Sequence, residues 1–314
     1  MSHFERALEL AERGHGKTHD HPLVGAVVVR DGTVVGEGWY EYDGVRHAEV
    51  IALEQAGEAA RGATLYVTLE PCSHHGRTPP CADAVVAAGL ARVVAGARDP
   101  NPVVDGRGIE RIRAAGIEVE LLDDLVARRQ NEAWRVWKSL GRPFVTYKAA
   151  ITLDGRVSVP GRRWVSGEES RRRVHELRAD SDVVAVGMGT VRADAPRLDA
   201  RDVGAARQPR RLAFGHGPLP EASELELRSG PLDDELRALA AEGVQSVLLE
   251  GGPTLATAFI AAGLVDKLLL FVAPVLAGEG PHVFGELEAP LELLHLRAEP
   301  SGEDVLVEAY LREP

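Results

Sequence analysis

Short apolar runs alternate with helix-like segments along the whole chain. Residues 23–29 and 33–39 are apolar or β-branched runs on either side of Arg30-Asp31-Gly32, which predicts a hairpin because Asp-Gly suits a tight turn. Residues 47–60 have the apolar spacing of a helix, and residues 64–69 have the composition of a buried strand. This alternation predicts an α/β fold in which helices cover a sheet.

The alternation continues through two halves that meet at Gly141-Arg142-Pro143, a sequence that ends helices. In the first half we expect helices at 81–89, 108–115 and 123–140 and strands at 91–97 and 117–121. In the second half we expect strands at 144–150, 182–186, 211–214, 246–249, 267–274 and 305–311, and helices at 168–177, 233–241 and 254–262. The sequence therefore predicts two domains, residues 1–141 and 144–314, each long enough to bury its own core.

Composition and charge narrow the class of protein. The chain is 45% apolar and 27% charged, and no apolar run reaches the roughly 20 residues of a membrane span. Its net charge of −12 argues against binding to nucleic acid and favours a small-molecule substrate. Residues 1–20 carry acidic residues and a helical spacing instead of a secretion signal, which predicts a cytoplasmic protein whose two cysteines stay reduced.

Both cysteines lie in one stretch downstream of His47-Ala48-Glu49, a combination with the H-x-E and P-C…C pattern of hydrolytic zinc deaminases. His47, Cys72 and Cys81 supply three ligands of the types that zinc prefers and leave a fourth position open for a water. Glu49 follows His47 by two residues, and we expect it to face that open position as the general acid/base. The sequence thus predicts one Zn²⁺ per chain and a catalytic Glu49.

Other interpretations of these residues stay open. The histidine and the cysteines could be ordinary core residues, or the zinc could be purely structural with His74 or His75 as a fourth ligand. We expect those two histidines to line the substrate pocket instead. A zinc-stabilised binding protein would have no need of Glu49, and a deaminase of nucleic acids would not be expected to carry the acidic charge and the long second domain of this chain.

The motifs extend well beyond the zinc ligands. The loop Pro71-Cys-Ser-His-His-Gly-Arg-Thr-Pro-Pro-Cys81 resembles that of the bifunctional riboflavin-biosynthesis enzymes, in which a pyrimidine deaminase is fused to a pyrimidine reductase. Similar segments cover nearly the whole chain: Thr68-Leu69-Glu70-Pro71, Asp99-Pro100-Asn101-Pro102, Gly106-Arg107-Gly108, Lys148-Ala149-Ala150, Leu153-Asp154-Gly155, Gly189-Thr190-Val191, Ala193-Asp194 and Glu250-Gly251-Gly252.

This resemblance implies a fold and a reaction sequence. The first domain would be a cytidine-deaminase-like three-layer α/β/α domain, and the second a dihydrofolate-reductase-like α/β domain. The first would deaminate 2,5-diamino-6-ribosylamino-4(3H)-pyrimidinone 5′-phosphate by zinc-dependent hydrolysis. The second would reduce the ribose of the product to ribityl with NADPH, and family analogy further implies a homo-oligomer.

The resemblance also implies which residues of the second domain bind ligands. NADPH would be bound by Ala150, Trp164, Thr190 and Asp194, with Gly252, Pro253 and Thr254 at the pyrophosphate. The substrate would be bound by Arg178, Leu198, Arg201 and Glu250, with Lys148 and Asp154 in the same pocket. The residues themselves support part of this, because a strand, a glycine pair and a helix start at residues 248–254 can present N–H groups to a phosphate, although such a turn can also be purely structural.

A run of arginines stands out in this acidic chain. It comprises Arg162, Arg163, Arg171, Arg172, Arg173 and Arg178. Clustered arginines can bind phosphate bidentately, but they also occur on solvated helix faces. The sequence leaves both interpretations open.

Three departures from the family pattern bear on function. His21 occupies the place of an asparagine that would hydrogen-bond the deaminase substrate, and a direct contact of His21 with the metal is a further alternative. The stretch before Trp164 lacks the usual small polar residues, and the second domain is shortened between about 215 and 245. Either the reductase works with a trimmed cofactor cleft, or the chain is an active deaminase with a degenerate, structural reductase-like domain.

Overall fold

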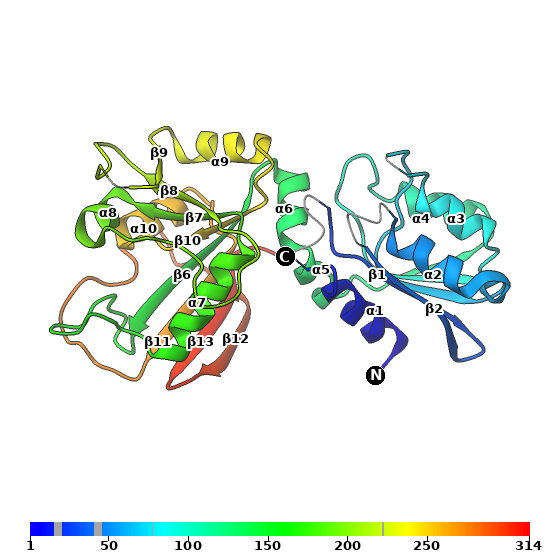
Figure 1. Ribbon diagram of the computed structural model, residues 1–314, viewed down its shortest axis with the longest axis horizontal. Helices are drawn as coiled ribbons and strands as arrows, with labels where there is room; N and C mark the ends of the chain where they lie inside the picture. The colour runs from blue at the N-terminus through cyan, green and yellow to red at the C-terminus, as the bar shows by residue number, and fades with distance from the viewer. Residues whose placement is uncertain (16–20, 41–45, 77, 222) are drawn as a thin grey trace. The chain divides into compact units, whose positions relative to one another are not determined.

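The computed structural model describes residues 1–15, 21–40, 46–76, 78–221 and 223–314. The chain divides into two compact units, Met1–Leu140 and Gly141–Glu313 (Figure 1). Each unit has its own sheet and its own buried core, and each is described here by itself. None of the described helices combines the length and the apolarity that crossing a membrane requires.

The first unit is built on a five-stranded sheet with the order β2-β1-β3-β4-β5. Strand β1 pairs antiparallel with both β2 and β3, whereas β3, β4 and β5 are parallel. The strands are β1 (Gly25–Arg30), β2 (Thr33–Trp39), β3 (Thr64–Leu69), β4 (Arg92–Ala97) and β5 (Glu118–Leu121).

Helices cover both faces of this sheet. One face packs against α1 (His3–Glu12) and α5 (Leu125–Gln130), and the other against α2 (Ala48–Ala56), α3 (Cys81–Ala87) and α4 (Arg107–Ala114). The alternation along β1 explains the two faces, because Ala26 and Val28 join the core under α2 while Val27 and Val29 pack against α1. This is the three-layer α/β/α arrangement that the family resemblance implies.

Two glycines set how closely α2 approaches the sheet. A Cβ atom at Gly38 would lie 2.3 Å from the carbonyl oxygen of Ala48, and one at Gly36 would lie 2.1 Å from that of Ala52. Neither position could carry a side chain without moving the helix. The two glycines therefore place the start of α2, which carries His47 and Glu49, directly over the sheet.

The second unit contains an eight-stranded sheet with the order β12-β13-β11-β6-β10-β7-β8-β9. The strands β6 to β11 are parallel, and β13 and β12 are added antiparallel at one edge. Their bounds are β6 (Phe144–Thr152), β7 (Val183–Gly187), β8 (Arg210–Phe214), β9 (Glu226–Arg228), β10 (Ser246–Leu249), β11 (Lys267–Ala273), β12 (Leu294–Ser301) and β13 (Asp304–Tyr310).

Helices lie on both faces of the second sheet as well. The larger core contains residues of α9 (Leu232–Ala241) and α10 (Pro253–Ala261), and a smaller core on the other face contains residues of α7 (Glu168–Asp180) and α8 (Met188–Asp194). Most of this sheet is parallel and buried, in line with its runs of Val and Leu. The predicted α/β class is confirmed for both units.

Several elements of the structure differ from the predicted ones, for different reasons. The helix predicted at 123–140 is two helices, α5 and α6 (Glu132–Leu140), because the side chain of Asn131 bonds both the N–H and the C=O of Leu23. The helix predicted at 47–60 ends at Ala56 and is followed by a 3₁₀ turn, η2 (Gly57–Ala60), with Gly57 at φ 52°. Helix α8 was not predicted. The edge strands β9 and β12 were not predicted either, because β9 has only three residues and β12 is mostly exposed.

Candidate functional site

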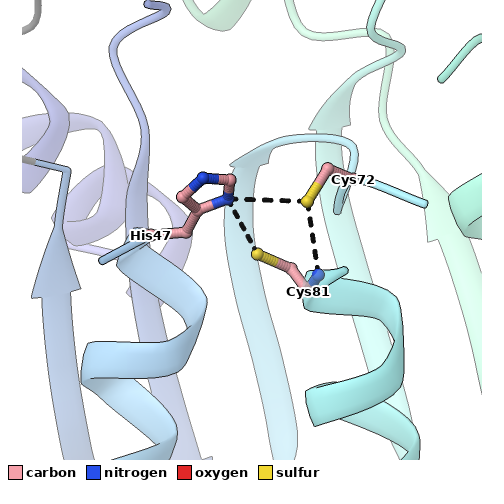
Figure 2. A group of neighbouring side chains, drawn as sticks. All are labelled: His47, Cys72 and Cys81. Atoms are coloured by element: carbon pink, nitrogen blue, oxygen red, sulfur yellow. Dashed lines mark hydrogen bonds between the residues drawn. The ribbon is translucent and has the colours of Figure 1, made fainter. Parts of the chain in front are cut away.

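The three predicted metal ligands come from three different elements of the first unit. His47 is the residue that precedes α2, Cys72 follows β3, and Cys81 is the first residue of α3. His47 Nδ1 lies 3.0 Å from Cys81 Sγ and 3.5 Å from Cys72 Sγ (Figure 2). In the part of the chain that the structure describes, this is the one cluster of three such side chains whose donor atoms all lie within 4.8 Å of one another.

The donor set fits zinc. Two thiol sulfurs and one imidazole nitrogen are ligands that Zn²⁺ prefers, and three protein ligands leave room for a water. Neither His74 nor His75 belongs to the cluster, and neither does His21. His74 and His21 line the neighbouring cavity, as predicted for pocket residues, whereas His75 does not. The arrangement offers no fourth side-chain ligand among the described residues, which favours an open, catalytic site over a closed, structural one.

The two cysteines share their charge unequally. The pKa of Cys72 is lowered to about 4, and the largest cause is the hydrogen bond with the Cys81 side chain. His47 and the Cys81 backbone N–H, which lies 3.2 Å from Cys72 Sγ, act in the same direction against the opposing effect of burial. The pKa of Cys81 is raised by its interaction with Cys72 and by burial. The pair therefore holds one thiolate, and a bound cation would displace the remaining thiol proton.

Glu49 lies in the first turn of α2 and is 3% exposed. Burial raises its pKa to about 7, although the neighbouring His47 acts in the opposite direction. A carboxyl group with a pKa near neutrality can both accept and donate a proton at physiological pH. Its environment therefore suits the acid/base role that the sequence predicts.

The cluster opens into a cavity of about 280 Å³. Tyr40 packs edge-on against both His21 and His47, with ring centroids 5.3 and 5.5 Å apart. Cys81 is fully buried and does not line the cavity, whereas His47, Cys72 and Glu49 do. The lining is His21, Pro22, Val24, Tyr40, His47, Ala48, Glu49, Leu69, Glu70, Cys72, His74, Gly76, Thr78, Asp99, Asn101, Trp134 and Lys138. Arg77, part of the quoted motif, lies outside the described residues.

Glu70 holds one wall of this cavity in place. Its carboxylate accepts hydrogen bonds from the backbone N–H groups of Gly106 (3.0 Å), Gly108 (3.1 Å) and Ile109 (3.3 Å). Burial raises the pKa of Glu70 despite these donors. A Cβ atom at Gly108 would lie 1.9 Å from the carbonyl oxygen of Pro71, so the motif glycine is required for this close approach. Glu70 thereby ties the loop after β4 to the loop that carries Cys72.

Several cavity residues were not assigned a role from the sequence. Asp99 accepts hydrogen bonds from Trp134 Nε1 (3.2 Å) and from the N–H of Asn101 (2.9 Å), which brings helix α6 to the loop after β4. Asp99 and Asn101 belong to a motif quoted above, which was the available signal for them. Tyr40, Trp134 and Lys138 have no such signal, because their place in the cavity depends on contacts between distant segments.

The second unit contains a larger cleft of about 940 Å³. Ala149, Val157, Val174 and Gly251 form part of its wall, and His175, Arg163 and Arg171 also line it. It brings together nine of the residues predicted to bind NADPH or substrate: Lys148, Ala150, Trp164, Arg178, Thr190, Asp194, Arg201, Glu250 and Gly252.

Four predicted residues do not line this cleft. Leu198 is 2% exposed and belongs to the smaller core, and Pro253 and Thr254 form the first turn of α10. The Asp154 carboxylate accepts hydrogen bonds from the N–H groups of Ala277 (3.0 Å) and Gly278 (2.8 Å). Asp154 thus ties the turn after β6 to the loop after β11.

The glycine turn of the cleft fits the pyrophosphate of a dinucleotide. Gly252 precedes α10, and a Cβ atom there would point toward Thr190 Oγ1 at 3.7 Å. A Cβ atom at Gly251 would lie 3.0 Å from Leu255 Cδ2. The turn therefore leaves a helix N-terminus accessible beside Thr190, Asp194 and Ala150, in a cleft large enough for a cofactor.

Glu250 is the acidic centre of the cleft, and 9% of its side chain is exposed. It accepts hydrogen bonds from Arg178 Nε (2.6 Å) and Nη2 (3.0 Å) and from Lys148 Nζ (3.3 Å). Burial by itself would raise the pKa of Glu250, but the charges of Lys148 and Arg178 outweigh it and lower the pKa to about 2. The three side chains form a fixed charged group at the end of β10.

This lowered pKa predicts a loss of stability in acid. The folded-state pKa of about 2 lies below the ordinary value of 4.5, so the stabilisation is complete above 4.5 and is lost as the pH falls toward 2. We expect the ionised Glu250 to contribute roughly 3 kcal/mol to the free energy of unfolding. In urea unfolding of the second unit, the stability advantage of the wild type over Glu250→Gln should shrink between pH 5 and pH 3.

The matched control for that experiment is Glu299→Gln, which removes an exposed carboxylate that pairs with Arg173. The free energies of unfolding of Glu299→Gln and the wild type should differ little at both pH values, because exposed ion pairs contribute little to stability. An advantage of the wild type over Glu250→Gln that does not change with pH would contradict the prediction.

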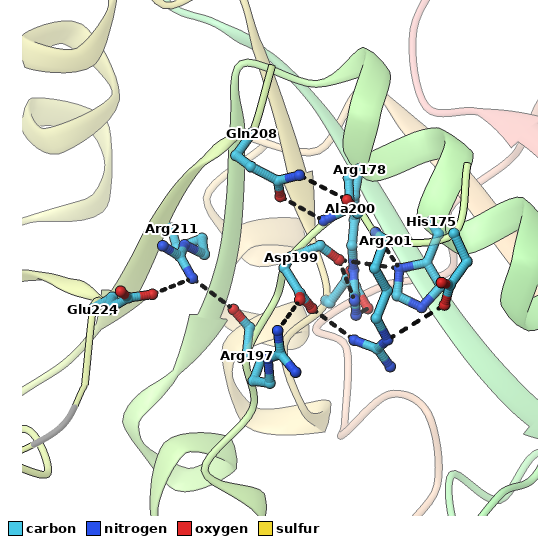
Figure 3. Close-up of polar contacts among 11 residues, drawn as sticks. His175, Arg178, Arg197, Asp199, Ala200, Arg201, Gln208, Arg211 and Glu224 are labelled. Atoms are coloured by element: carbon cyan, nitrogen blue, oxygen red, sulfur yellow. Dashed lines mark hydrogen bonds and ion pairs between the residues drawn. The ribbon is translucent and has the colours of Figure 1, made fainter. Parts of the chain in front are cut away.

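A second charged group ties the residues after α8 to helix α7. Asp199 pairs with Arg201 Nη1 (2.6 Å) and Arg197 Nη2 (2.7 Å), and its carbonyl oxygen accepts from Arg178 Nη1 at 3.1 Å (Figure 3). His175 Nδ1 lies 3.0 Å from the same carbonyl oxygen. Burial lowers the pKa of His175, and the charges of Arg178 and Arg201 act in the same direction. Arg178 and Arg201 are thereby held at the cleft.

Comparisons with known proteins cover both units. Residues 143–307 match the RibD C-terminal domain, and residues 1–97 match the cytidine and deoxycytidylate deaminase zinc-binding region. The curated riboflavin biosynthesis protein RibD of Aquifex aeolicus is 38% identical over 345 aligned positions, which cover 98% of this chain and 97% of the relative.

Solved structures agree over the same length. RibD of Acinetobacter baumannii matches with a TM-score of 0.84 and 36% identity, over 98% of this chain and 97% of the other. A diaminohydroxyphosphoribosylaminopyrimidine deaminase/5-amino-6-(5-phosphoribosylamino)uracil reductase of Thermotoga maritima matches with a TM-score of 0.82 and 34% identity, again over 98% and 97%. The expected fold classes, cytidine-deaminase-like and dihydrofolate-reductase-like, are confirmed.

Proposed function

This chain belongs to the RibD family of riboflavin-biosynthesis enzymes, which unite a deaminase and a reductase, and from that premise we propose how its two sites divide the work. The first unit hydrolyses the amino group of 2,5-diamino-6-ribosylamino-4(3H)-pyrimidinone 5′-phosphate. The second unit reduces the ribose of that product to ribityl with NADPH. The observation that carries the proposal is the cluster of His47, Cys72 and Cys81 together with a buried Glu49 beside one cavity.

In the deaminase unit, His47, Cys72 and Cys81 hold one zinc ion. Zinc in such a site supplies a water that is acidic enough to lose a proton near neutral pH. Glu49 would take the first proton of that water and deliver it to the ring nitrogen while the oxygen adds to the ring carbon that bears the amino group. It would then take the second proton, from the hydroxyl so formed, and deliver it to the amino group, so that the C–N bond breaks and neutral ammonia leaves. Its pKa of about 7 suits both directions of transfer.

Polar residues of the cavity wall orient the pyrimidine. His21 offers a donor or an acceptor where an amide would offer both, so the pyrimidine edge needs further partners. Asp99 accepts from Trp134 Nε1 and its backbone N–H donates to Glu70, and the N–H of Asn101 donates to Asp99. Asp99 and Asn101 lie on the same cavity wall and supply these partners. A cavity of about 280 Å³ matches a heterocycle more closely than a polymer.

In the reductase unit, NADPH supplies the hydride, so this chain needs to bind and align two ligands. Ala150, Trp164, Thr190, Asp194 and Gly252 face the cofactor, and the first turn of α10 with Pro253 and Thr254 presents backbone N–H groups to its pyrophosphate. The substrate is held by Lys148, Arg178, Arg201 and Glu250, while Leu198 and Asp154 support the walls from behind.

Three further parts of the proposal follow from family membership. They are a preference for NADPH, a homo-oligomeric state and a cytoplasmic location. The alternative of a degenerate second domain is not favoured, because the full-length matches and the RibD C-terminal domain cover the second unit as well. Whether the short 215–245 segment trims the cofactor cleft stays a prediction.

Product analysis tests the proposal. Purified protein is given the diaminopyrimidine ribotide with and without NADPH, and the products are identified by mass spectrometry. Without NADPH we expect the deaminated ribosyl compound to accumulate; with NADPH we expect its ribityl form and a matching oxidation of cofactor. Deamination without any NADPH oxidation would assign the second unit a structural role, and no deamination at all would overturn the proposal.

A further inference from the structure

The structure separates the six arginines that the sequence leaves as one group. Arg172 pairs with Glu169 and Glu176 on its own helix, Arg173 pairs with Glu299, and Arg178 pairs with Glu250. Arg162 does not line the cleft. This leaves Arg163 and Arg171, which do line it. Among the residues that the structure describes, neither of them forms an ion pair with a carboxylate.

These two arginines meet on one exposed aromatic ring. Arg163 Cζ lies 4.9 Å and Arg171 Cζ 5.6 Å from the centroid of Trp164, which is 51% exposed and faces the same cleft. Arg171 Nη1 also donates to the carbonyl oxygen of Ser166 (2.7 Å), which fixes the guanidinium beside the ring. We call Arg163, Trp164 and Arg171 the arginine bracket. It combines two positive charges and an exposed aromatic face in a cleft of about 940 Å³.

The other charges of the cleft leave the bracket electropositive. Lys148 and Arg178 share the single carboxylate of Glu250, and Arg201 shares that of Asp199 with Arg197. Of the other lining carboxylates, Glu169 pairs with Arg172 and Asp202 lies 4.0 Å from Arg201. Glu168 lies one turn before Arg171 on α7 and Asp194 belongs to α8, and within the described residues neither forms an ion pair with a bracket arginine. Two guanidinium groups on one ring repel each other unless an anion lies between them, and their planar forks match phosphate oxygens.

We propose that the arginine bracket is a binding site for a phosphate monoester. This rests on the proposed function, because both ligands of the second unit carry such a group: the 5′-phosphate of the pyrimidine substrate and the 2′-phosphate of NADPH. The pyrophosphate of the cofactor is accounted for by the glycine turn at Gly251-Gly252. The bracket therefore supplies recognition of a terminal phosphate, in a part of the cleft where the family pattern has small polar residues.

Inorganic phosphate tests the site directly. Trp164 is the one tryptophan of residues 141–314, so the fluorescence difference between the wild type and Trp164→Phe reports on the bracket. We expect a saturable change with phosphate that weakens at high salt. Arg163→Gln and Arg171→Gln should each weaken binding by about tenfold, because a hydrogen bond to a charged group contributes on that order. Arg163→Lys should be intermediate, since it keeps the charge without the fork.

The controls remove one positive charge beside each bracket residue. Arg162→Gln and Arg173→Gln change the net charge by the same amount, and neither side chain lines the cleft. Both should bind phosphate within about twofold of the wild type, because their charges are screened at this distance. No saturable change in the wild type, or equal losses in the bracket variants and the controls, would overturn the proposal.

A second set of measurements identifies the source of the phosphate. Dissociation constants are measured for NADPH and NADH, and for the deaminated ribosyl compound with and without its 5′-phosphate. If the bracket binds the cofactor, Arg163→Gln and Arg171→Gln lose about tenfold in the NADPH-over-NADH preference; if it binds the substrate, they lose the same factor in the phosphate-over-dephospho preference. If neither preference falls, the bracket does not serve the ligands of this unit and the proposal is wrong.

These outcomes are distinguishable from a failure of the proposed function. Should the wild type form no riboflavin-pathway product but still bind inorganic phosphate, with binding lost in the bracket variants alone, the site stands and the assigned reaction fails. Should the products form while the bracket variants behave like Arg162→Gln and Arg173→Gln, the reaction stands and the site fails.

Discussion

Replacement of Glu49 by glutamine is expected to slow ammonia release by about a thousandfold while the zinc content stays at one per chain. Glutamine keeps the size of the side chain but can neither take a proton from water nor return it to the leaving amino group. Glu49 is 3% exposed, so no solvent group replaces it easily. It is also absent from the cluster of His47, Cys72 and Cys81, so the metal should remain.

The measurement is steady-state ammonia release together with elemental analysis of the purified variant. Glu54→Gln is the matched control, because Glu54 lies on the same helix α2 but is exposed and pairs with Arg46. It should retain turnover within about twofold, as expected for an exposed ion pair. Turnover of Glu49→Gln at the wild-type rate would remove Glu49 from the mechanism, and loss of zinc would instead mean that Glu49 helps to hold the metal.

Replacement of Cys72 by serine is expected to remove both the zinc and the deaminase activity and to leave the reductase intact. A serine hydroxyl does not ionise at neutral pH, whereas the pKa of Cys72 is already lowered to about 4 before any metal binds. Two ligands then remain of three. We expect zinc affinity to fall by more than about a hundredfold, because changes outside the ligand shell already reduce it 10–100-fold.

Two assays separate the units in this variant. Ammonia release from the diaminopyrimidine ribotide should be lost, while NADPH oxidation on supplied deaminated compound should continue, because the second unit has its own core. Ser73→Ala, one position along the same loop, is the matched control and should keep zinc and both activities. A Cys72→Ser protein that deaminates without zinc would overturn the metal assignment.

The sequence allowed the first site to be predicted more completely than the second. The expected metal ligands and the acid/base residue lie in two short segments, His47-Ala48-Glu49 and the loop from Cys72 to Cys81. Each segment adjoins a helix or strand with a clear hydrophobic pattern. The helix break at Asn131 could not be predicted in this way, because its cause is the backbone of Leu23, 108 positions away in the sequence. The roles of Tyr40 and Trp134 in the cavity wall depend on distant contacts in the same manner.

By itself the sequence determined the α/β class and the family to which the chain is similar, and it predicted the zinc-ligand set and the position where the two units meet, since all of these depend on residue type and local spacing. Only the tertiary structure decided which charges remain available for a ligand. Arg163 and Arg178 look alike in the sequence, yet Arg178 pairs with Glu250, 72 positions away, while Arg163 stands against an exposed ring without a carboxylate partner among the described residues. Charge pairing acts through space over a few ångströms, and distance along the chain does not specify it.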